Sequence, residues 1–259
     1  MSAGVPTPAL PMTFSGGDAL VTGAASGIGA AIARTLMSAG VRTIRMDLRA
    51  PQPDPDFPAD LQAGVEIDVR EPDLLDRLTA AGVEPDRVAY LVNCAGVLDD
   101  TGFSGVDRTM WLRCLEINLM GAYNTIDALT PVLRLASRAA VVNISSIEAG
   151  RVVALTNPDP TPQYAASKAA LQMLTQTAAR ALAGDGIRVN SVSPGFVATP
   201  MAAAHGDTGV LPSALASRVP AGRFAAPADI AHAVAFLLSD QAGYITGSDL
   251  RVDGGFQLT

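Results

Sequence analysis

The sequence predicts an α/β fold: a doubly wound, mostly parallel sheet of about seven strands with helices on both faces, in three αβα layers. Short β-rich runs alternate with helical patterns along the chain, which implies parallel strands joined by right-handed crossovers. The composition agrees, because 259 residues with 49% hydrophobic and 17% charged side chains can bury one large core.

The expected elements follow one another as this fold requires. The β-rich runs predict strands, in chain order, at residues 19–22, 41–46, 64–69, 88–93, 139–145, 187–193 and 250–252. The helical patterns predict helices at residues 28–38, 72–81, 106–137, 164–182 and 227–238. We find no internal repeat and no second domain.

Most of these strands end at a recognisable break in the sequence. The breaks, in order, are the glycine-rich stretch 22–29, Asp47 before a proline-rich loop, Asp68 before Pro72, Asn93 before a small-residue turn, the pair Ser145-Ser146, and Pro194-Gly195. In an open α/β sheet, ligands bind beyond the carboxyl ends of the strands. We therefore expect the functional residues at these breaks.

The two ends and the charge exclude several classes of protein. Residues 1–13 contain three prolines and no basic segment, so we expect a mobile tail rather than a signal peptide, followed by one domain over 14–259. No stretch approaches the roughly 18 apolar residues of a membrane span. The net charge of −7 and the absence of clustered Lys and Arg argue against a nucleic-acid surface.

Cysteine and histidine are too few and too scattered for a metal site or a disulfide framework. The cysteines are Cys94 and Cys114, and the histidines are His205 and His232, none at metal-ligand spacing. This usage fits a reducing cytoplasm, with the cysteines acting as small buried apolar residues. We predict no bound metal.

Three loops are longer than a simple crossover requires. They cover residues 49–58, 147–163 and 195–220. The last two follow strand ends, so we expect them to form the walls of a substrate pocket.

The first strand is followed by a glycine cluster, Thr22-Gly23-Ala24-Ala25-Ser26-Gly27-Ile28-Gly29, that opens a helix. Glycines there permit a tight turn and close approach to a pyrophosphate, whose charge a helix N-terminus favours. The spacing differs from the commoner G-x-G-x-x-G, so a packing turn is the alternative. Asp47, which ends the second strand, could accept from both ribose hydroxyls and repel a 2′-phosphate, which predicts NAD(H) over NADP(H).

Three neighbouring residues leave the cofactor preference and the adenine contact open. Arg45 and Arg49 flank Asp47 and could soften the preference for NAD(H). Asp68, which ends the third expected strand, could meet the adenine amino group or could cap the helix that starts at Pro72.

The most informative pair is Tyr164 and Lys168, since Lys168 is the only lysine in the chain. At i and i+4 the two side chains share a helix face. An ammonium beside a phenol favours the phenolate, which would make Tyr164 a usable acid/base near neutrality. The alternative is a lysine on the wet side of the helix.

Other polar residues stand at strand ends or in apolar surroundings. Asn118 interrupts an apolar helical stretch, so it needs a buried partner or belongs to a polar relay. Ser145 and Ser146 end the fifth strand, and one of these hydroxyls could face a substrate oxygen.

With these residues in this order, the sequence resembles the short-chain dehydrogenase/reductase family, in its single-domain branch of about 250 residues with a Rossmann fold. The resemblance spans residues 18–256 and rests on the turn 22–29, the stretch 93–96, Asn118, Ser146, Tyr164 and Lys168, Pro194-Gly195 with Thr199, and the ending 252–255. It implies that Tyr164 is the general acid/base, that Lys168 lowers its pKa and binds the nicotinamide ribose, and that Ser146 holds the substrate oxygen. Asn118 would support a water that feeds protons to Lys168.

The resemblance also implies a set of residues that bind the dinucleotide. They are Gly23, Ser26, Gly27, Ile28, Gly29, Asp47, Leu48, Asp68, Val69, Asn93, Ala95, Gly96, Tyr164, Lys168, Pro194, Gly195, Val197 and Thr199. A homotetramer is implied as well, with the helices at 106–137 and 164–182 at one interface.

The chain departs from the family pattern in two places. Cys94 stands where a second asparagine is commoner, and seventeen residues separate Ser146 from Tyr164, with a proline-rich stretch at 157–162. We expect a rigid flap there. The longer spacing leaves both Ser146 and Ser145 as candidates for the substrate contact.

The expected pocket is apolar. Its candidate walls are Val97, Leu98, Ile147, Val152, Val153, Leu155, Phe196, Val197 and Met201. Arg151 is the one nearby cation that could hold a carboxylate, although we expect it to be exposed, and we expect Glu148 at the periphery.

The sequence therefore predicts an NAD(H)-dependent oxidoreductase that interconverts an apolar secondary alcohol and a ketone of cyclic or terpenoid size. An NADPH-dependent carbonyl reductase is the alternative enzyme. A catalytically silent nucleotide-binding scaffold is the alternative of another class, and the intact set of Asn118, Ser146, Tyr164 and Lys168 argues against it.

Overall fold

The computed structural model describes residues 12–99, 101–153, 160–204 and 210–259. Its sheet has seven strands, all parallel, in the order β3-β2-β1-β4-β5-β6-β7. The strands are β1 (Asp18–Thr22), β2 (Thr43–Asp47), β3 (Gln62–Glu66), β4 (Val88–Asn93), β5 (Ala139–Ile144), β6 (Ile187–Pro194) and β7 (Asp249–Val252). The predicted doubly wound α/β fold is confirmed.

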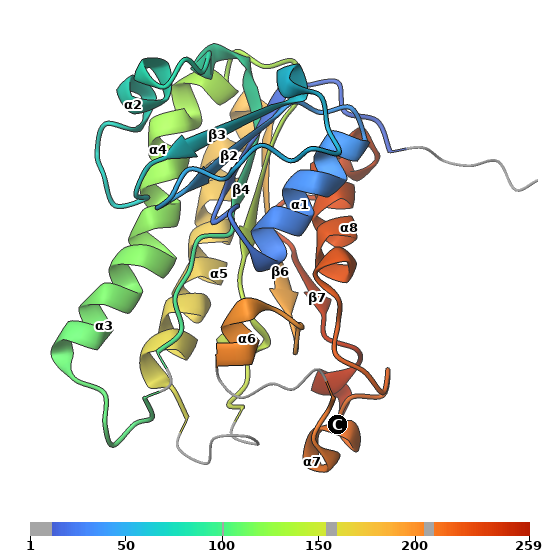
Figure 1. The fold of residues 1–259 in the computed structure, drawn as a ribbon. Coiled ribbons are helices and arrows are strands. Elements are labelled where there is room, and N and C mark those ends of the chain that lie inside the picture. Colours follow the sequence, from blue (N-terminus) through green and yellow to red (C-terminus); the bar gives the residue numbers. More distant parts are fainter. Residues whose placement is uncertain (1–11, 100, 154–159, 205–209) are drawn as a thin grey trace, which may run out of the picture.

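Helices cover both faces of this sheet (Figure 1). They are α1 (Gly27–Ser38), α2 (Leu74–Ala80), α3 (Arg108–Leu115), α4 (Gly121–Leu133), α5 (Pro162–Leu182), α6 (Pro200–Ala204), α7 (Ser213–Ala216) and α8 (Pro227–Leu238). One core joins α1 and α8 to the sheet through side chains such as Ile32 and Val234. The other joins α4 and α5 to the opposite face through side chains such as Leu129 and Leu182.

The connections reverse direction between β1 and β4. From β1 the chain builds outward through β2 to β3, and it then returns to place β4 on the other side of β1. Such a switch point leaves a crevice at the carboxyl ends of the strands, where ligands bind in open α/β sheets.

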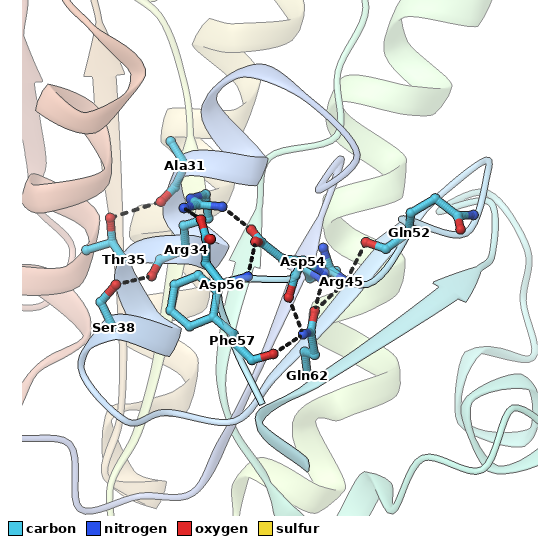
Figure 2. Close-up of polar contacts among 10 residues, drawn as sticks. All are labelled: Ala31, Arg34, Thr35, Ser38, Arg45, Gln52, Asp54, Asp56, Phe57 and Gln62. Atoms are coloured by element: carbon cyan, nitrogen blue, oxygen red, sulfur yellow. Dashed lines mark hydrogen bonds and ion pairs between the residues drawn. The ribbon is translucent and has the colours of Figure 1, made fainter. Parts of the chain in front are cut away.

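The third strand starts two residues earlier and ends three residues earlier than the expected range of 64–69. The Gln62 side chain explains its start: Nε2 donates to the carbonyls of Asp54 and Phe57 at 2.8 and 2.9 Å, and Oε1 accepts from Arg45 at 2.8 Å (Figure 2). At the other end, the Arg70 amide donates to the Asp68 carboxylate at 2.9 Å, which turns the chain away. Asp68 therefore follows the strand rather than ending it.

The expected single helix at 106–137 is three segments. A π-helical segment, Glu116–Met120, separates α3 from α4, and α4 ends at Leu133. The π turn contains Asn118, whose side chain bonds the backbone of Val97 in both directions, at 2.8 and 3.0 Å. A polar side chain tied across to another loop accounts for the local widening of the helix.

The loops 147–163 and 195–220 contain short helical turns that the sequence did not predict. Ile147–Ala149 forms a 3₁₀ turn, and α6 and α7 lie in the second loop. Within the described ranges, every helix is too short or too polar to cross a bilayer.

Candidate active site

A cavity of about 900 Å³ opens at the carboxyl ends of the strands. The turn after β1, the ends of β2, β5 and β6, and the two long loops all contribute to its walls. Most of the residues that the sequence assigns to dinucleotide and substrate line it. These are Gly23, Ser26, Gly27, Ile28, Gly29, Asp47, Leu48, Asp68, Val69, Ala95, Gly96, Ser146, Tyr164, Lys168, Pro194, Gly195, Val197 and Thr199.

The glycine turn is built so that backbone lies against backbone. Gly23 has φ of +66°, and a Cβ there would lie 2.8 Å from the Ala95 backbone; a Cβ at Gly29 would lie 2.2 Å from the Gly23 carbonyl oxygen. The Thr22 hydroxyl fixes the neighbouring strand end by accepting from the amides of Cys94 and Ala95, both at 3.0 Å. Only glycine fits these two positions.

This turn presents the N-terminus of α1 to the cavity. Ser26 caps the helix without a side-chain hydrogen bond, and among the described residues the first turn carries no acid. The first amides of the helix are therefore available to an anion, as a pyrophosphate site requires.

Asp47 closes the β2 side of the cavity. Its carboxylate accepts from the Ala25 amide at 3.0 Å and from the Leu48 amide at 2.8 Å. Arg45 turns away from it: this buried guanidinium donates to the carbonyl of Gln52 at 2.9 Å and to Gln62, beside the ion pairs that tie Arg34 of α1 to the loop (Figure 2). Arg45 therefore does not compensate the charge of Asp47.

A cation that the sequence analysis missed lies at the same end of the cavity. Arg70 lines the cavity and donates to the Asp68 carboxylate through Nε at 3.0 Å and through Nη2 at 2.5 Å. The hydrogen bonds from Arg70 lower the pKa of Asp68 below its usual value. Asp68 does not cap the following helix, because the N-cap of α2 is Asp73.

Together these residues fit a nicotinamide dinucleotide. The crevice offers free helix amides for a pyrophosphate, a carboxylate for ribose hydroxyls and a glycine turn that admits close approach.

The reacting groups meet at the other end of the cavity. The Ser146 hydroxyl lies near enough to the Tyr164 phenol to act on its pKa, and it accepts from the Glu148 amide at 3.1 Å. Ser145 is directed elsewhere, since its hydroxyl donates to the Lys168 carbonyl at 3.2 Å. Of the two serines, Ser146 is thus the one that contacts Tyr164.

Lys168 lies beside Tyr164 on α5. Its Nζ donates to the Ile144 carbonyl at 2.8 Å and lies 5.7 Å from the centroid of the Tyr164 ring. The side chain is only 5% exposed, so it does not lie on the wet side of the helix. Burial lowers the pKa of Lys168 to about 8.

The expected acidity of the Tyr164 phenol is not found in the protein alone. The pKa of Tyr164 is raised above its usual value, first by burial and then by the nearby Glu148 carboxylate, while the bond with Ser146 acts in the opposite direction. Burial and Glu148 both oppose the expected effect of the lysine, and the spacing of Tyr164 and Lys168 in the sequence reports neither. Lowering this pKa therefore requires an additional positive charge at the site.

Asn118 does not line the cavity. Besides Val97, its amide nitrogen donates to the Ser167 hydroxyl at 3.0 Å. A Cβ at Gly96 would lie 3.3 Å from Asn118 Oδ1 and 3.5 Å from Lys168 Nζ, so the two side chains approach each other at Gly96. Asn118 thus holds the Gly96–Val97 backbone against Lys168.

The Asn93 side chain does not reach the cavity either. It is 5% exposed, donates to Asn143 at 2.9 Å and accepts from Thr125 at 2.6 Å. Asn143 in turn donates to Thr175 of α5 at 2.8 Å. Asn93 is not among the residues that line the cavity, and its side chain belongs to a buried network that ties β4 and β5 to α4 and α5.

The substrate end of the cavity has mostly the expected apolar walls. Val97, Leu98, Ile147, Val153, Phe196, Val197 and Met201 line it. Val152 is 73% exposed and does not line it, and Leu155 lies outside the described residues. Arg151 donates to the Phe256 carbonyl at 3.3 Å and is not among the lining residues.

Glu148 was expected at the periphery, and that expectation is wrong. Its side chain lines the substrate end, and burial raises its pKa to about 7. Its position two residues after Ser146, on a strand-end turn, was the available signal.

Comparison with known proteins identifies the family. A profile of the family described as enoyl-(acyl carrier protein) reductase matches residues 23–257. The chain is 34% identical to the 3-oxoacyl-[acyl-carrier-protein] reductase of Thermotoga maritima, over 95% of this chain and 100% of that protein. It is 38% identical to the human (3R)-3-hydroxyacyl-CoA dehydrogenase, over 92% of this chain and 94% of that protein.

A solved structure shares both the fold and part of the sequence. The aldohexose dehydrogenase of Thermoplasma acidophilum, in ligand-free form, superposes with a TM-score of 0.79 at 29% identity, covering 95% of this chain and 97% of that one. The chain therefore belongs to the short-chain dehydrogenase/reductase family, as an oxidoreductase acting on CH–OH groups.

Proposed function

We propose that this protein interconverts a secondary alcohol and a ketone with NAD(H), and that its substrate is apolar and of cyclic or terpenoid size. One observation carries the proposal: Ser146, Tyr164 and Lys168 are grouped at one end of a cavity whose other end carries Asp47. A dinucleotide bound along this lining would have its ribose hydroxyls at Asp47 and its nicotinamide ring at the reacting groups.

In the oxidising direction, Tyr164 takes the hydroxyl proton of the substrate while Ser146 holds the same oxygen. When bound, the oxidised nicotinamide ring supplies the hydride acceptor and a positive charge. Bringing a phenol from a pKa of about 10 to about 7.5 takes roughly 3 kcal/mol of preferential phenolate stabilisation. Protonated Lys168, beside the Tyr164 ring, contributes to this stabilisation of the phenolate. Burial and the Glu148 carboxylate raise the pKa of Tyr164, so more stabilisation is required.

The preference for NAD(H) rests on Asp47. A 2′-phosphate at this position would meet a carboxylate, and Arg45 is engaged elsewhere. The position of Arg70 in the cavity wall favours the alternative, an NADPH-dependent carbonyl reductase, although its guanidinium is already paired with Asp68. The ratio of kcat/KM for NAD(H) to that for NADP(H), measured before and after replacing Asp47, distinguishes the two enzymes.

The substrate proposal rests on the apolar walls. The names of the relatives describe 3-oxoacyl, 3-hydroxyacyl and aldohexose substrates, so they support the alcohol–ketone chemistry and differ in the remainder of the substrate. Two unpaired cysteines support a reducing compartment, and we propose the cytoplasm.

The test is a dinucleotide-reduction screen over cyclic, terpene, steroid and aliphatic secondary alcohols, run with NAD+ and with NADP+. We expect turnover of apolar cyclic alcohols with NAD+ preferred. Turnover restricted to charged, acyl-carrier-linked or sugar substrates would overturn the substrate proposal. Binding of a dinucleotide without turnover of any alcohol would favour the silent scaffold.

A further inference from the structure

Glu148 occupies a defined place beside the reacting groups. It lies on the 3₁₀ turn Ile147–Ala149, for which Ser146 is the N-cap. Its amide donates to the Ser146 hydroxyl at 3.1 Å. This hydrogen bond therefore fixes the backbone of Glu148 relative to Ser146, the serine next to Tyr164.

A second contact holds the carboxyl itself. The Thr161 hydroxyl donates to Glu148 Oε2 at 3.3 Å, and Thr161 is 8% exposed. Thr161 precedes α5, three residues before Tyr164. Glu148 thus bridges the loop after β5 and the start of the helix that carries Tyr164, with both ends of the bridge in the cavity wall.

Apart from Ser146, Thr161 and Tyr164, the surroundings of this carboxyl include apolar side chains. Ile147, Val153 and Phe196 line the same region, and among the described residues no cation forms an ion pair with Glu148. A carboxyl without a cationic partner in an apolar wall is costly to bury. In ligand pockets, such isolated polar groups orient the ligand and select it.

We propose that Glu148 is a specificity-determining residue that hydrogen-bonds a second hydroxyl of the substrate, adjacent to the carbinol held by Ser146 and Tyr164. The preferred substrate is then an apolar ring or chain that carries a vicinal diol, or the matching hydroxyketone. This inference rests on the proposed alcohol–ketone chemistry and narrows its substrate class.

A hydroxyl fits this position better than a charged group. The pKa of Glu148 is about 7, so the carboxyl is present in both protonation states near neutrality. A hydroxyl can donate to the carboxylate and accept from the acid, whereas an ammonium can only donate. A substrate carboxylate would be repelled by ionised Glu148.

The wild-type protein provides the first test. Initial rates of NAD+ reduction are compared for cyclohexanol, cis- and trans-1,2-cyclohexanediol and 2-methoxycyclohexanol, and for the same set built on the best alcohol of the screen. We expect kcat/KM for one diol isomer to exceed that of the monoalcohol by about tenfold, mostly through KM. Methylation of the second hydroxyl removes its donor and should lower that advantage severalfold.

Variants locate the effect at Glu148. In Glu148→Leu the ratio of kcat/KM for diol over monoalcohol should fall to about one, through a higher KM for the diol. Glu148→Gln, which keeps the shape and hydrogen-bonding groups, should retain part of the ratio. Glu84→Gln is the matched control, because Glu84 is exposed and remote from the cavity, and its ratio should equal that of the wild type.

The outcomes are distinguishable. Equal kcat/KM for diol and monoalcohol in the wild type, or a diol preference that survives Glu148→Leu, would overturn the inference and leave the proposed function standing. A preference for 2-aminocyclohexanol over every diol would overturn it in favour of a cationic substrate. Turnover of none of these alcohols with either dinucleotide would overturn the proposed function together with it.

Discussion

Lys168 places a cation in the interior of the protein, which lowers the stability of the fold although the proposed activity needs it. Its Nζ has the Ile144 carbonyl as a partner, and within the described ranges no carboxylate forms an ion pair with it. Burial lowers its pKa from 10.5 to about 8. The unfolded chain therefore binds this proton more tightly, and the stability cost is full below pH 8 and disappears as the pH rises through 10.5.

Replacing this lysine should accordingly stabilise the protein while abolishing its activity. Lys168→Met keeps the apolar stem and removes the buried charge, so we expect Tm at pH 7 to rise, by about 2 to 4 °C for each kcal/mol recovered. Calorimetric melting of the wild type and the variant measures it. A lower Tm for Lys168→Met would show that the bond to Ile144 outweighs the burial of the charge.

Glu148 should give the stability a pH dependence of the opposite kind. Its pKa rises from 4.5 to about 7 in the folded protein, so the folded state binds the proton more tightly. This contribution is full below pH 4.5 and is lost as the pH rises through 7, by up to roughly 3 kcal/mol. Glu148→Gln removes it, so its Tm relative to wild type should be higher at pH 8 than at pH 5. An equal difference in Tm between variant and wild type at pH 5 and pH 8 would contradict the raised pKa of Glu148.

At the scale of elements, the turn between β1 and α1 packs backbone closely against backbone, and the proposed cofactor site lies on it. A Cβ at Gly23 would lie 2.8 Å from the Ala95 backbone in a conformation with φ of +66°. We expect Gly23→Ala to weaken dinucleotide binding at least tenfold in calorimetric titration and to lower stability by about 1 to 3 kcal/mol.

Gly184→Ala is the control, because a Cβ there would meet no atom within 4 Å among the described residues and no positive φ is required. It should bind dinucleotide as the wild type does. Unchanged binding by Gly23→Ala would mean that this turn does not hold the cofactor.

The same turn illustrates which features could be predicted from the sequence. The parallel, doubly wound sheet and the glycine turn follow from local patterns, because alternation of strands and helices implies parallel crossovers. Asn118 was marked as a buried amide in need of partners, and it has them in Val97 and Ser167. These features depend on residues close together in the sequence or on general rules of the fold.

The features that escaped prediction depend on contacts between distant segments. Gln62 extends β3 because it meets the loop that contains Asp54. Arg70 and Glu148 enter the cavity because of how their turns are oriented, and a single sequence carries no periodicity for a turn. The pKa of Tyr164 depends on burial, which sequence spacing does not report.

At the scale of the whole molecule, four exposed apolar side chains lie on the helices that the family resemblance places at a subunit interface. Leu112, Met120, Tyr123 and Met173 are 44%, 45%, 45% and 58% exposed, on or between α3, α4 and α5. Exposed apolar side chains on these helices favour association. We predict a homotetramer of about 106 kDa, four times the chain mass of 26.5 kDa, in sedimentation equilibrium. A single species at the mass of one chain would contradict it.

The sheet topology brings Asp47 and Tyr164, which are far apart in the sequence, to one crevice. The proposed function depends above all on transfer of the substrate proton by the Tyr164 hydroxyl. The most direct measurement is the steady-state rate of NAD+ reduction by Tyr164→Phe beside the wild type, with dinucleotide affinity measured in parallel. We expect a kcat at least about 100-fold lower with affinity little changed; near-normal turnover in the variant would rule out this role for Tyr164.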